Sequence, residues 1–302
     1  MTRPLNPIDR RQFLGASGAL LLAAACQPAS VAPAASNQIS KVGLQTYTLR
    51  EALAEDFVGT FEMIKDVGYD FVELNGRNFT DRTPSELRQI LDGVGLPAPA
   101  SHVDYNSVAD TPEQLAETAA TLGCNYVIVP WLADDQRGAD DYKRHAAMMN
   151  RSGEILAASN VRLAYHNHQF EFFDLGGGQT GMDTLLAETD PARVFFEIDL
   201  FWAAVAGIDI PALFAAHPGR FKLCHIKDMS GDPAPYANSI DFGTIVQELM
   251  VNVGEGTLPF ETYFAENDVS GLEYFIAEHD NPPRPFRQSI QTSYDAVKAM
   301  RF

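Results

Sequence analysis

Three polar residues, His166, Asn167 and His168, end an apolar run that reads as a buried strand. An imidazole can ligate a divalent metal, and because it titrates near neutral pH it can also carry protons. Glu171 lies three residues beyond His168 and adds a carboxylate to the same short segment. Metal binding and proton transfer are therefore the chemistries that this stretch suggests.

Polar side chains of the same kinds follow five other predicted strands. Alternate residues of a strand share a face, and in each case the ionisable or imidazole residues share one parity. Burying them together without compensation would cost on the order of several kcal/mol for each charge, and a divalent cation would provide that compensation. A mixed shell of imidazoles and carboxylates suits Mn, Co, Zn or Fe. The residues on these faces are Glu73 and Asn75, His102 and Asp104, His166 and His168, Glu197 and Asp199, His225 and Lys227, and Glu278 and Asp280.

The elements that must position these residues alternate along the chain from Ile39 onward. β-Rich runs predict strands at Lys41–Thr46, Phe71–Asn75, Ala98–His102, Tyr126–Pro130, Val161–Asn167, Val194–Asp199, Phe221–Lys227 and Tyr274–Glu278. Helices are expected at about 57–67, 84–94, 112–122, 140–159, 180–188, 209–216, 241–250 with 260–267, and 286–301. Two helices carry start signals in which Thr precedes Pro and then Glu or Gln, beginning at Thr83 and at Thr111.

Eight successive βα units predict an α/β fold with a closed parallel barrel. A (β/α)8 TIM barrel takes about 250 residues and carries its reacting groups at the carboxyl ends of the strands. An open doubly wound sheet is the alternative, but it would more often place a glycine-rich phosphate loop after its first strand. The segment from Gly43 to Tyr47 supplies no such loop. We therefore predict a TIM-barrel catalytic domain at residues 39–302.

The N-terminal residues carry an export pattern. Arg10 and Arg11 precede a short Ala- and Leu-rich run, well below the roughly 20 residues that a membrane-spanning helix needs. We predict a twin-arginine signal peptide at residues 1–25, an uncleaved anchor helix being the alternative, and a flexible tether at 26–38. The expected partner is the twin-arginine export machinery, and the expected location is periplasmic or extracytoplasmic. A lipobox-like sequence would place a lipid on Cys26, whereas ordinary cleavage after Ala34 would not.

The charge of the chain limits its partners. The 302 residues have a formal net charge of −18, and loss of residues 1–25 would leave about −20, since three arginines and one aspartate would go. Such a surface repels phosphate backbones, which argues against nucleic acid as a partner. Cys124 and Cys224 begin predicted strands far apart in the chain, so we expect no disulfide framework.

Five segments of the sequence resemble the sugar phosphate isomerase/epimerase family of xylose-isomerase-like TIM barrels. They read AYHNHQFEF, FEIDLFWAAVAGIDI, CHIKDM, NVGEGTLPF and YFIAEHD, in this order along the chain. The resemblance covers about residues 40–300. It implies a metal-dependent enzyme acting on a sugar, and relatives of this type are often exported by the twin-arginine route.

The resemblance also implies one divalent metal ion with one ligand from each of strands five to eight, usually Glu, Asp, His and Glu. Strands six, seven and eight offer Asp199, His225 and Glu278. Strand five departs from this pattern, because His166 takes the place of the glutamate, and His168 and Glu171 are alternative ligands there. The change also removes a carboxylate that transfers protons in epimerase relatives.

The implied chemistry is removal of a proton next to a carbonyl. A metal stabilises the enolate as its charge develops, and a positioned base takes the proton. Glu278 is expected to be both ligand and base, and Lys227 is expected to neutralise the oxyanion. His102 and His168 are expected to bind hydroxyl groups or shuttle protons.

Three further residues are assigned around the same site. Glu171 and Glu73 are acid or base candidates, and Glu73 is also expected to contact substrate. Trp202 stands where some relatives have a second polar ligand, and it is expected to form a sugar-stacking wall or part of the core.

Three outcomes share this chemistry. Reprotonation at the neighbouring oxygen-bearing carbon isomerises a keto-sugar, reprotonation on the other face epimerises it, and expulsion of a β-substituent is the reaction of a lyase. Since phosphorylated sugars are mainly cytoplasmic, we expect an unphosphorylated keto-sugar or sugar derivative. The alternative is a non-catalytic carbohydrate-binding lipoprotein on the same barrel. A DNA-repair nuclease on a related fold is disfavoured by the acidic surface.

Overall fold

The computed structural model describes Met1 and residues 37–76 and 81–302. The arginine pair, Cys26 and most of the predicted tether lie outside the described residues, so the export and lipidation assignments stay predictions. From Asn37 to Phe302 the chain belongs to one compact unit. Among the described helices, none combines the length and apolar character needed to cross a bilayer.

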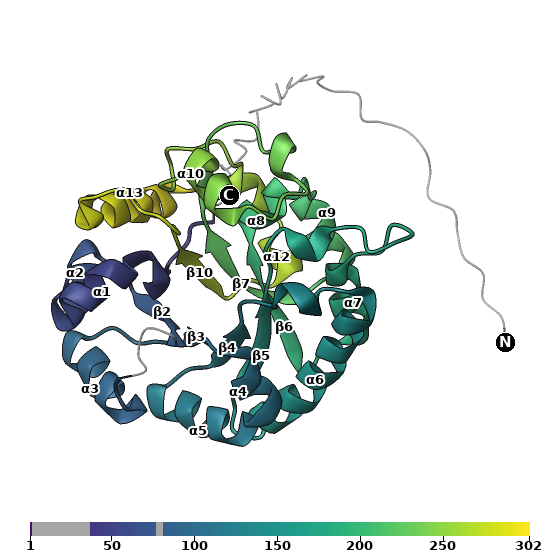
Figure 1. Cartoon of the computed structure of the whole chain (residues 1–302), viewed down its shortest axis with the longest axis horizontal. Helices are drawn as coiled ribbons and strands as arrows, with labels where there is room; N and C mark the ends of the chain where they lie inside the picture. Colours follow the sequence, from purple (N-terminus) through teal and green to yellow (C-terminus); the bar gives the residue numbers. More distant parts are fainter. Residues whose placement is uncertain (2–36, 77–80) are drawn as a thin grey trace. The chain divides into compact units, whose positions relative to one another are not determined.

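Eight parallel strands close into a barrel at the centre of this unit (Figure 1). Around the barrel their order is β1, β10, β7, β6, β5, β4, β3 and β2, so each strand pairs with its neighbours in the chain and the last pairs with the first. The strands are β1 (Val42–Gln45), β2 (Phe71–Asn75), β3 (Ala100–His102), β4 (Tyr126–Val129), β5 (Arg162–His166), β6 (Val194–Asp199), β7 (Phe221–Ile226) and β10 (Tyr274–Ala277).

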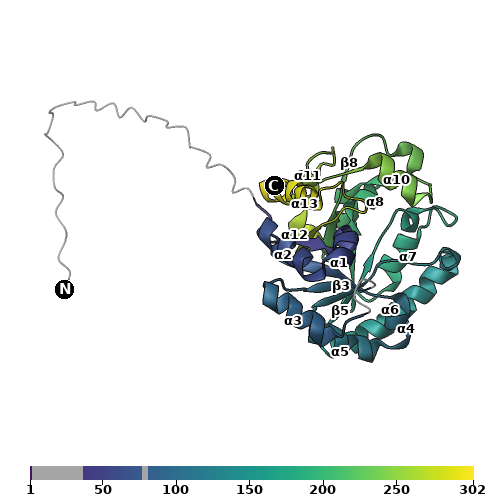
Figure 2. The same cartoon turned by 60° about the vertical axis from the view of Figure 1, so that its left-hand side comes forward.

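Helices surround the barrel, as the turned view also shows (Figure 2). They are α1 (Arg50–Glu55), α2 (Phe57–Val67), α3 (Pro84–Val94), α4 (Tyr105–Asp110), α5 (Pro112–Leu122), α6 (Ala139–Ala157), α7 (Gly181–Glu188), α8 (Leu200–Val205), α9 (Ile210–Ala216), α10 (Phe242–Leu249), α11 (Phe260–Phe264), α12 (Asn267–Ser270) and α13 (Phe286–Ala299). Short 3-10 turns lie at Thr46–Leu49, Asp134–Gln136, Phe170–Phe172 and Ala234–Tyr236.

The lower part of the barrel interior is packed with apolar side chains. Gly43 leaves room for the ring of Phe71, since a Cβ at this glycine would lie 2.1 Å from Cε2 of Phe71. These apolar side chains form one cluster, which includes the interior residue that the parity of β2, β3, β5, β7 and β10 assigns to the lower part of each strand. Its buried members are Phe71, Ala100, Tyr126, Ile128, Ala164, Leu223 and Ile276. The apolar floor leaves the polar residues of the same parity at the carboxyl ends, as predicted.

The predicted barrel is confirmed, and the eight predicted strands agree with the observed ones to within two residues at each end. The sequence analysis did not identify α1, α4, α8 or the two-stranded antiparallel sheet of β8 (Asp228–Met229) and β9 (Met250–Val251). Thr83 forms the expected capping box, but Thr111 does not cap α5. Its hydroxyl donates to the carbonyl of Ser107 instead, because the short helix α4 ends at this point.

Candidate metal centre and active site

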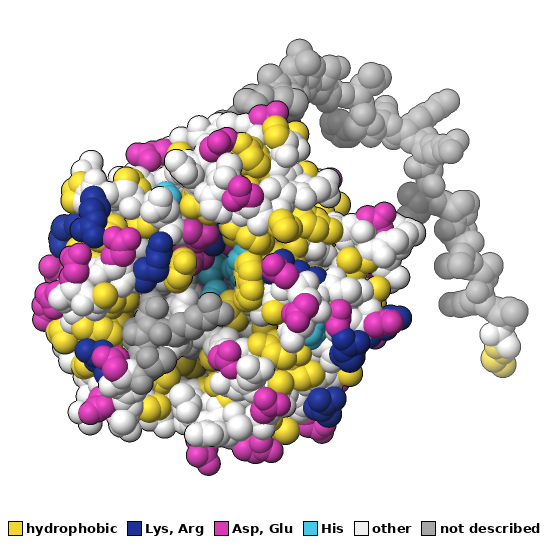
Figure 3. Space-filling view, in the orientation of Figure 1, with side chains coloured by type: hydrophobic (Ala, Val, Ile, Leu, Met, Phe, Trp, Pro, Cys, Tyr) yellow, Lys and Arg dark blue, Asp and Glu magenta, His cyan; other side chains and the backbone are white. Residues whose placement is uncertain are grey.

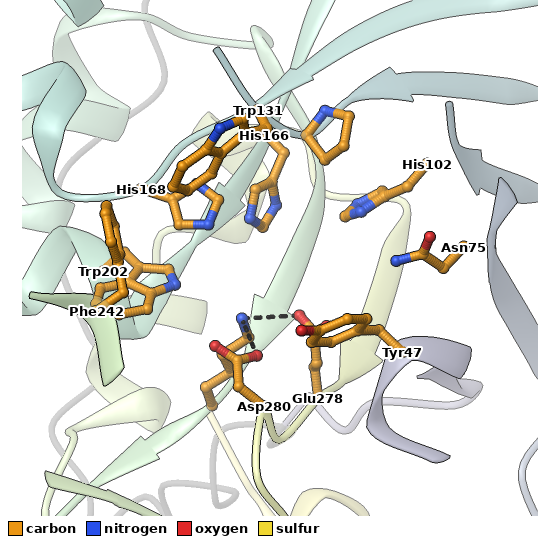
Figure 4. A pocket seen from close by; sticks show the side chains of 12 residues that line it. Tyr47, Asn75, His102, Trp131, His166, His168, Trp202, Phe242, Glu278 and Asp280 are labelled. Carbon is orange, nitrogen blue, oxygen red and sulfur yellow. Dashed lines mark ion pairs between the residues drawn. The ribbon is translucent and has the colours of Figure 1, made fainter. Parts of the chain in front are cut away.

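A cavity of about 320 Å³ opens at the carboxyl ends of the strands. Figure 3 shows histidine side chains at the bottom of the central hollow. Figure 4 shows aromatic rings on one side, including Trp131 and Phe242, and Tyr47 and Asn75 on the other. The lining residues are Tyr47, Asn75, His102, Pro130, Trp131, His166, His168, Trp202, Lys227, Phe242, Glu278 and Asp280.

A buried ammonium group stands at the floor of this cavity. Nζ of Lys227 lies 2.8 Å from Oε2 of Glu278, 2.9 Å from Oδ1 of Asp280 and 3.0 Å from Oδ2 of Asp199. Burial disfavours the charged lysine, but these three carboxylates outweigh it and hold the pKa of Lys227 well above its ordinary value. Lys227 is therefore a fixed positive charge.

His225 links the cavity floor to a deeper layer of the barrel. Its Nδ1 lies 2.6 Å from Oε2 of Glu278 and 3.9 Å from Oδ2 of Asp199, while its Nε2 lies 2.8 Å from Oε1 of Glu73. With a metal bound, a ring proton on Nε2 donated to Glu73 would leave the lone pair of Nδ1 free to bind the cation. This is the arrangement in which a carboxylate behind a histidine orients it as a metal ligand.

Asp199, His225 and Glu278 fit a divalent cation. Each offers one ligand atom, and these three atoms lie within 4.8 Å of one another. Oδ2 of Asp199 and Nδ1 of His225 are buried among charged groups of the same centre, with Nζ of Lys227 at 3.0 Å from Oδ2 and Oε2 of Glu278 at 2.6 Å from Nδ1. Burying several charged and polar groups together is costly without compensation, so donors that converge in this way suit a cation. Three protein ligands with an open position are typical of catalytic sites.

His166 stands where the family usually has a glutamate, and it contacts carboxylates of both the cavity floor and the deeper layer. Its Nδ1 lies 3.1 Å from Oε2 of Glu197, and its Nε2 lies 3.7 Å from Oδ2 of Asp199. The first contact is closer, and it follows from the register of β5 against β6, which pairs His166 directly with Glu197. Burial, with His225 nearby, holds the pKa of His166 well below its ordinary value, so the ring is neutral and able to ligate.

The charges around the centre favour a cation over a proton. Burial opposes ionisation of Glu278, but Lys227 and His225 outweigh it and hold its pKa below the ordinary range. Burial also opposes a charged His225, yet Glu197, Glu278 and Glu73 raise its pKa well above the ordinary value. The same negative field that attracts this proton would attract a metal, and metal binding would displace the proton.

One wall of the cavity is aromatic. The ring centroids of Trp131 lie 4.8 Å from His168 and 5.0 Å from Phe242, and Trp202 lies 5.5 Å from Phe242. Trp202 is only 1% exposed, so its faces are covered by neighbours and it forms part of the core. Its Nε1 and the Nδ1 of His168 are buried without hydrogen-bond partners among the described residues.

Two predicted site residues lie behind the cavity lining. Glu73 is fully buried, and its Oε1 is contacted by Gln45 and by Nε2 of His225. Glu171 accepts hydrogen bonds from the Tyr165 hydroxyl at 2.5 Å and from the His168 amide at 2.8 Å. In this geometry Glu73 orients His225, and Glu171 fixes the backbone that carries His168.

The sequence analysis overlooked several residues of the cavity. Tyr47 follows β1 and had a usable signal, since it continues the inward parity of Gly43 beyond the strand end. Trp131 follows β4 with the opposite parity to the inward Tyr126 and Ile128, so the strand pattern did not point to it. Asp280 and Glu197 were placed on the inward faces but were given no role. Phe242 begins α10, and no local pattern points to its contact with the aromatic wall.

Comparisons with known proteins agree with this fold. Residues 61–296 match the family described as "Xylose isomerase-like TIM barrel". An inosose dehydratase from Geobacillus thermodenitrificans is 28% identical over 153 residues, which cover 47% of this chain and 49% of that protein. The chain thus spans about half the length of the curated relatives that it matches.

Solved structures share the fold over most of its length. A sugar phosphate isomerase/epimerase from Parabacteroides distasonis superposes with a TM-score of 0.72 at 22% identity, covering 89% of this chain and 96% of that one. The IolI protein, solved with a bound zinc atom, superposes with a TM-score of 0.63 at 16% identity, covering 85% and 96%. At these identities the likeness shows the fold.

Proposed function

The chain belongs to the xylose isomerase-like TIM barrel family, and within this family we propose that it is a metal-dependent lyase acting on an unphosphorylated keto-sugar or keto-sugar derivative. One observation carries the proposal. A candidate base, a buried ammonium group and three converging metal donors meet on the floor of a single cavity at the barrel mouth.

Asp199, His225 and Glu278 would hold the metal. A divalent cation bound there would polarise the substrate carbonyl and acidify the neighbouring C–H bond. The mixed set of imidazole and carboxylate donors suits Zn, Mn, Co or Fe, and the zinc atom of the related IolI structure supports zinc as the first to test.

The residues of this chain supply the proton transfers. The Glu278 carboxylate takes the proton from the carbon beside the carbonyl, and the electron pair moves onto the carbonyl oxygen. The ammonium of Lys227, 2.8 Å from Glu278, neutralises the resulting enolate. When the carbonyl re-forms, the C–O bond at the β-carbon breaks. The leaving oxygen takes the proton that Glu278 carries, which returns Glu278 to its ionised state, and His168 lines the same cavity, where it can hydrogen-bond the leaving hydroxyl.

The cavity favours a substrate without phosphate. Lys227 is the one lysine or arginine among the described residues that line it, and three carboxylates already surround its ammonium group. Phosphate recognition normally uses arginines, lysines or free backbone amides. A sugar ring is better matched, since Trp131 offers a partly exposed aromatic surface and the opposite wall carries polar groups.

Elimination is preferred to epimerisation for two reasons. Epimerisation in relatives uses two carboxylates on opposite sides of the substrate. This chain lacks the second carboxylate, because His166 occupies its position. The curated relatives carry the name inosose dehydratase, and a dehydratase is a lyase that removes water. Isomerisation and non-catalytic carbohydrate binding remain the rivals that an experiment must separate.

The test incubates the zinc-loaded protein with a panel of keto-inositols and 3-keto-glucosides in deuterated water. Mass spectrometry should find a product lighter by the leaving group. A product that keeps the leaving group and is heavier only by the deuterium gained next to the carbonyl would identify an isomerase or epimerase instead. Binding with neither exchange nor product would identify a binding protein. Asp199→Asn provides the matched inactive control, since asparagine can still cap α8.

A further inference from the structure

A second group of imidazoles and carboxylates lies deeper in the barrel. Nε2 of His102 is 2.7 Å from Oε2 of Glu197, Nδ1 of His166 is 3.1 Å from the same oxygen, and Nε2 of His225 is 3.3 Å from it. The four residues are buried, and one ligand atom from each lies within 4.8 Å of the others. Glu197 precedes Asp199 by two residues on β6, so this group lies beneath the centre described above.

The deeper layer contains two carboxylates, those of Glu197 and Glu73, and in each of them only one oxygen is contacted by imidazole nitrogens. Oε2 of Glu197 is near three imidazole nitrogens, whereas its Oε1 is buried without a hydrogen-bond partner among the described residues. Glu73 behaves in the same way. Its Oε1 contacts His102 at 3.1 Å and His225 at 2.8 Å, whereas its Oε2 has no partner among the described residues. Each of these two buried carboxylates thus has only one of its oxygens contacted, and a cation bound beside them would offset the cost of burying their charges.

The deeper donors are independent of those of the upper centre. The upper centre uses Asp199, Glu278 and Nδ1 of His225, and the Nε2 proton of His225 can go to Glu73. Nε2 of His102, Nδ1 of His166 and Oε2 of Glu197 then remain for another ion. No imidazole has to lose both ring protons, so two cations can be bound at the same time.

We propose that this barrel holds a second divalent cation, bound by His102, His166 and Glu197 with Glu73 beside it. Two imidazoles and a carboxylate form a set that Zn²⁺ and other late first-row metals prefer. This second site also accounts for His166, which stands where relatives usually have a glutamate that would bind the upper metal. Nδ1 of His166 instead reaches Glu197 in the deeper layer. His102 and His166 both line the cavity, so the second cation would fix two side chains that face the substrate.

Zinc titration of the full-length protein tests this inference. The chelator-stripped protein is titrated with Zn²⁺ by calorimetry, and bound zinc is counted by mass spectrometry after gel filtration. We expect two zinc ions per chain for the wild type. His102→Asn and Glu197→Gln should each keep one, Asp199→Asn should keep the other, and the double variant Glu197→Gln/Asp199→Asn should keep neither. The control variant His217→Asn changes a histidine at the end of α9, outside both sites, and it should bind two zinc ions.

The number of zinc ions bound per chain decides between one site and two, and no activity measurement is needed. A wild type that binds one zinc ion overturns the second site whatever the variants do, and it leaves the proposed lyase intact if Asp199→Asn loses that ion. Cobalt titration gives a second readout, because two sites of different donor sets should yield two successive visible spectra. If the Glu197 variant does not fold, the wild-type zinc count and the cobalt spectra still decide between one site and two.

Discussion

Nδ1 of His225, on β7, lies 2.6 Å from Oε2 of Glu278, the residue directly after the neighbouring strand β10. The contact is set by the register that pairs His225 with Ile276, two residues before Glu278. Lys227 approaches the same carboxylate oxygen at 2.8 Å. Lys227 and His225 hold the pKa of Glu278 below its ordinary range, so Glu278 is ionised, as a general base must be.

Glu278→Gln should remove the base while keeping the shape of the side chain. We expect turnover to fall by roughly 10²- to 10⁴-fold, the range for loss of a general base, and exchange of the proton beside the carbonyl to fall with it. Steady-state kinetics and deuterium exchange measure the two effects. Glu273→Gln, one residue before β10 and partly exposed, is the matched control and should keep near-normal turnover.

Lys227→Met should destabilise the metal-free protein. The change leaves Asp199, Glu278 and Asp280 without their shared cation, and an uncompensated buried charge typically costs about 3–5 kcal/mol. Urea unfolding should show this loss, and added Zn²⁺ should recover part of it because the metal restores positive charge. Lys222→Met is the control on the same strand, since this lysine contacts partly exposed Glu273. Equal stability of the two variants would contradict the role of Lys227.

The two tryptophans of the chain, Trp131 and Trp202, both line the cavity. Intrinsic tryptophan fluorescence should therefore report substrate binding even without turnover, and the measurement needs no added label. Trp131→Leu should weaken binding by roughly threefold to tenfold through loss of an aromatic contact. Trp202→Phe keeps a ring in the core but removes the Nε1 donor, so we expect a similar loss from one hydrogen bond. A fluorescence signal unchanged by any bound keto-sugar would argue against this cavity as the binding site.

Glu171 should make stability depend on pH. Burial raises its pKa from 4.5 to about 7, although the Tyr165 hydroxyl and the His168 amide partly oppose the rise. The folded protein then binds a proton that the unfolded chain has lost, so the stabilisation is full below pH 4.5 and disappears as pH rises through 7. Over this window the linked change is up to about 3 kcal/mol.

Urea unfolding at several pH values between 4.5 and 8 measures this dependence. Glu171→Gln cannot titrate, so its stability should change less across the window than that of the wild type. Glu188→Gln, at the exposed end of α7, serves as the control. Parallel pH profiles for wild type and Glu171→Gln would rule out the assignment.

Export depends on residues outside the described part of the chain, and we propose that the arginine pair directs it. Changing Arg10 and Arg11 together to lysine keeps the charge but removes the twin-arginine signal, so the protein should accumulate in the cytoplasm. Fractionation and immunoblotting measure its location. Cys26→Ala should release the exported protein from the membrane fraction if a lipid is attached there, whereas normal export of the double lysine variant would disprove the signal.

Much of this molecule followed from local pattern. Alternating β-rich and helical segments predicted eight strands, because the period of apolar residues is set by backbone geometry. The parity of each strand then placed Asp199, His225 and Glu278 on the inward face, where they are found. Short elements such as α8 were not identified, because they begin directly at a strand end and carry no long periodic pattern.

The sequence alone therefore determined the barrel, the face of each strand and the kinds of groups at its mouth. Only the tertiary structure decided which of these groups meet. The register of β5 against β6 pairs His166 with Glu197 and brings Nδ1 of His166 to this deeper carboxylate, and the packing of Phe242 against Trp131 completes the aromatic wall. Strand stagger and contacts between distant segments are long-range properties, and no local pattern specifies them.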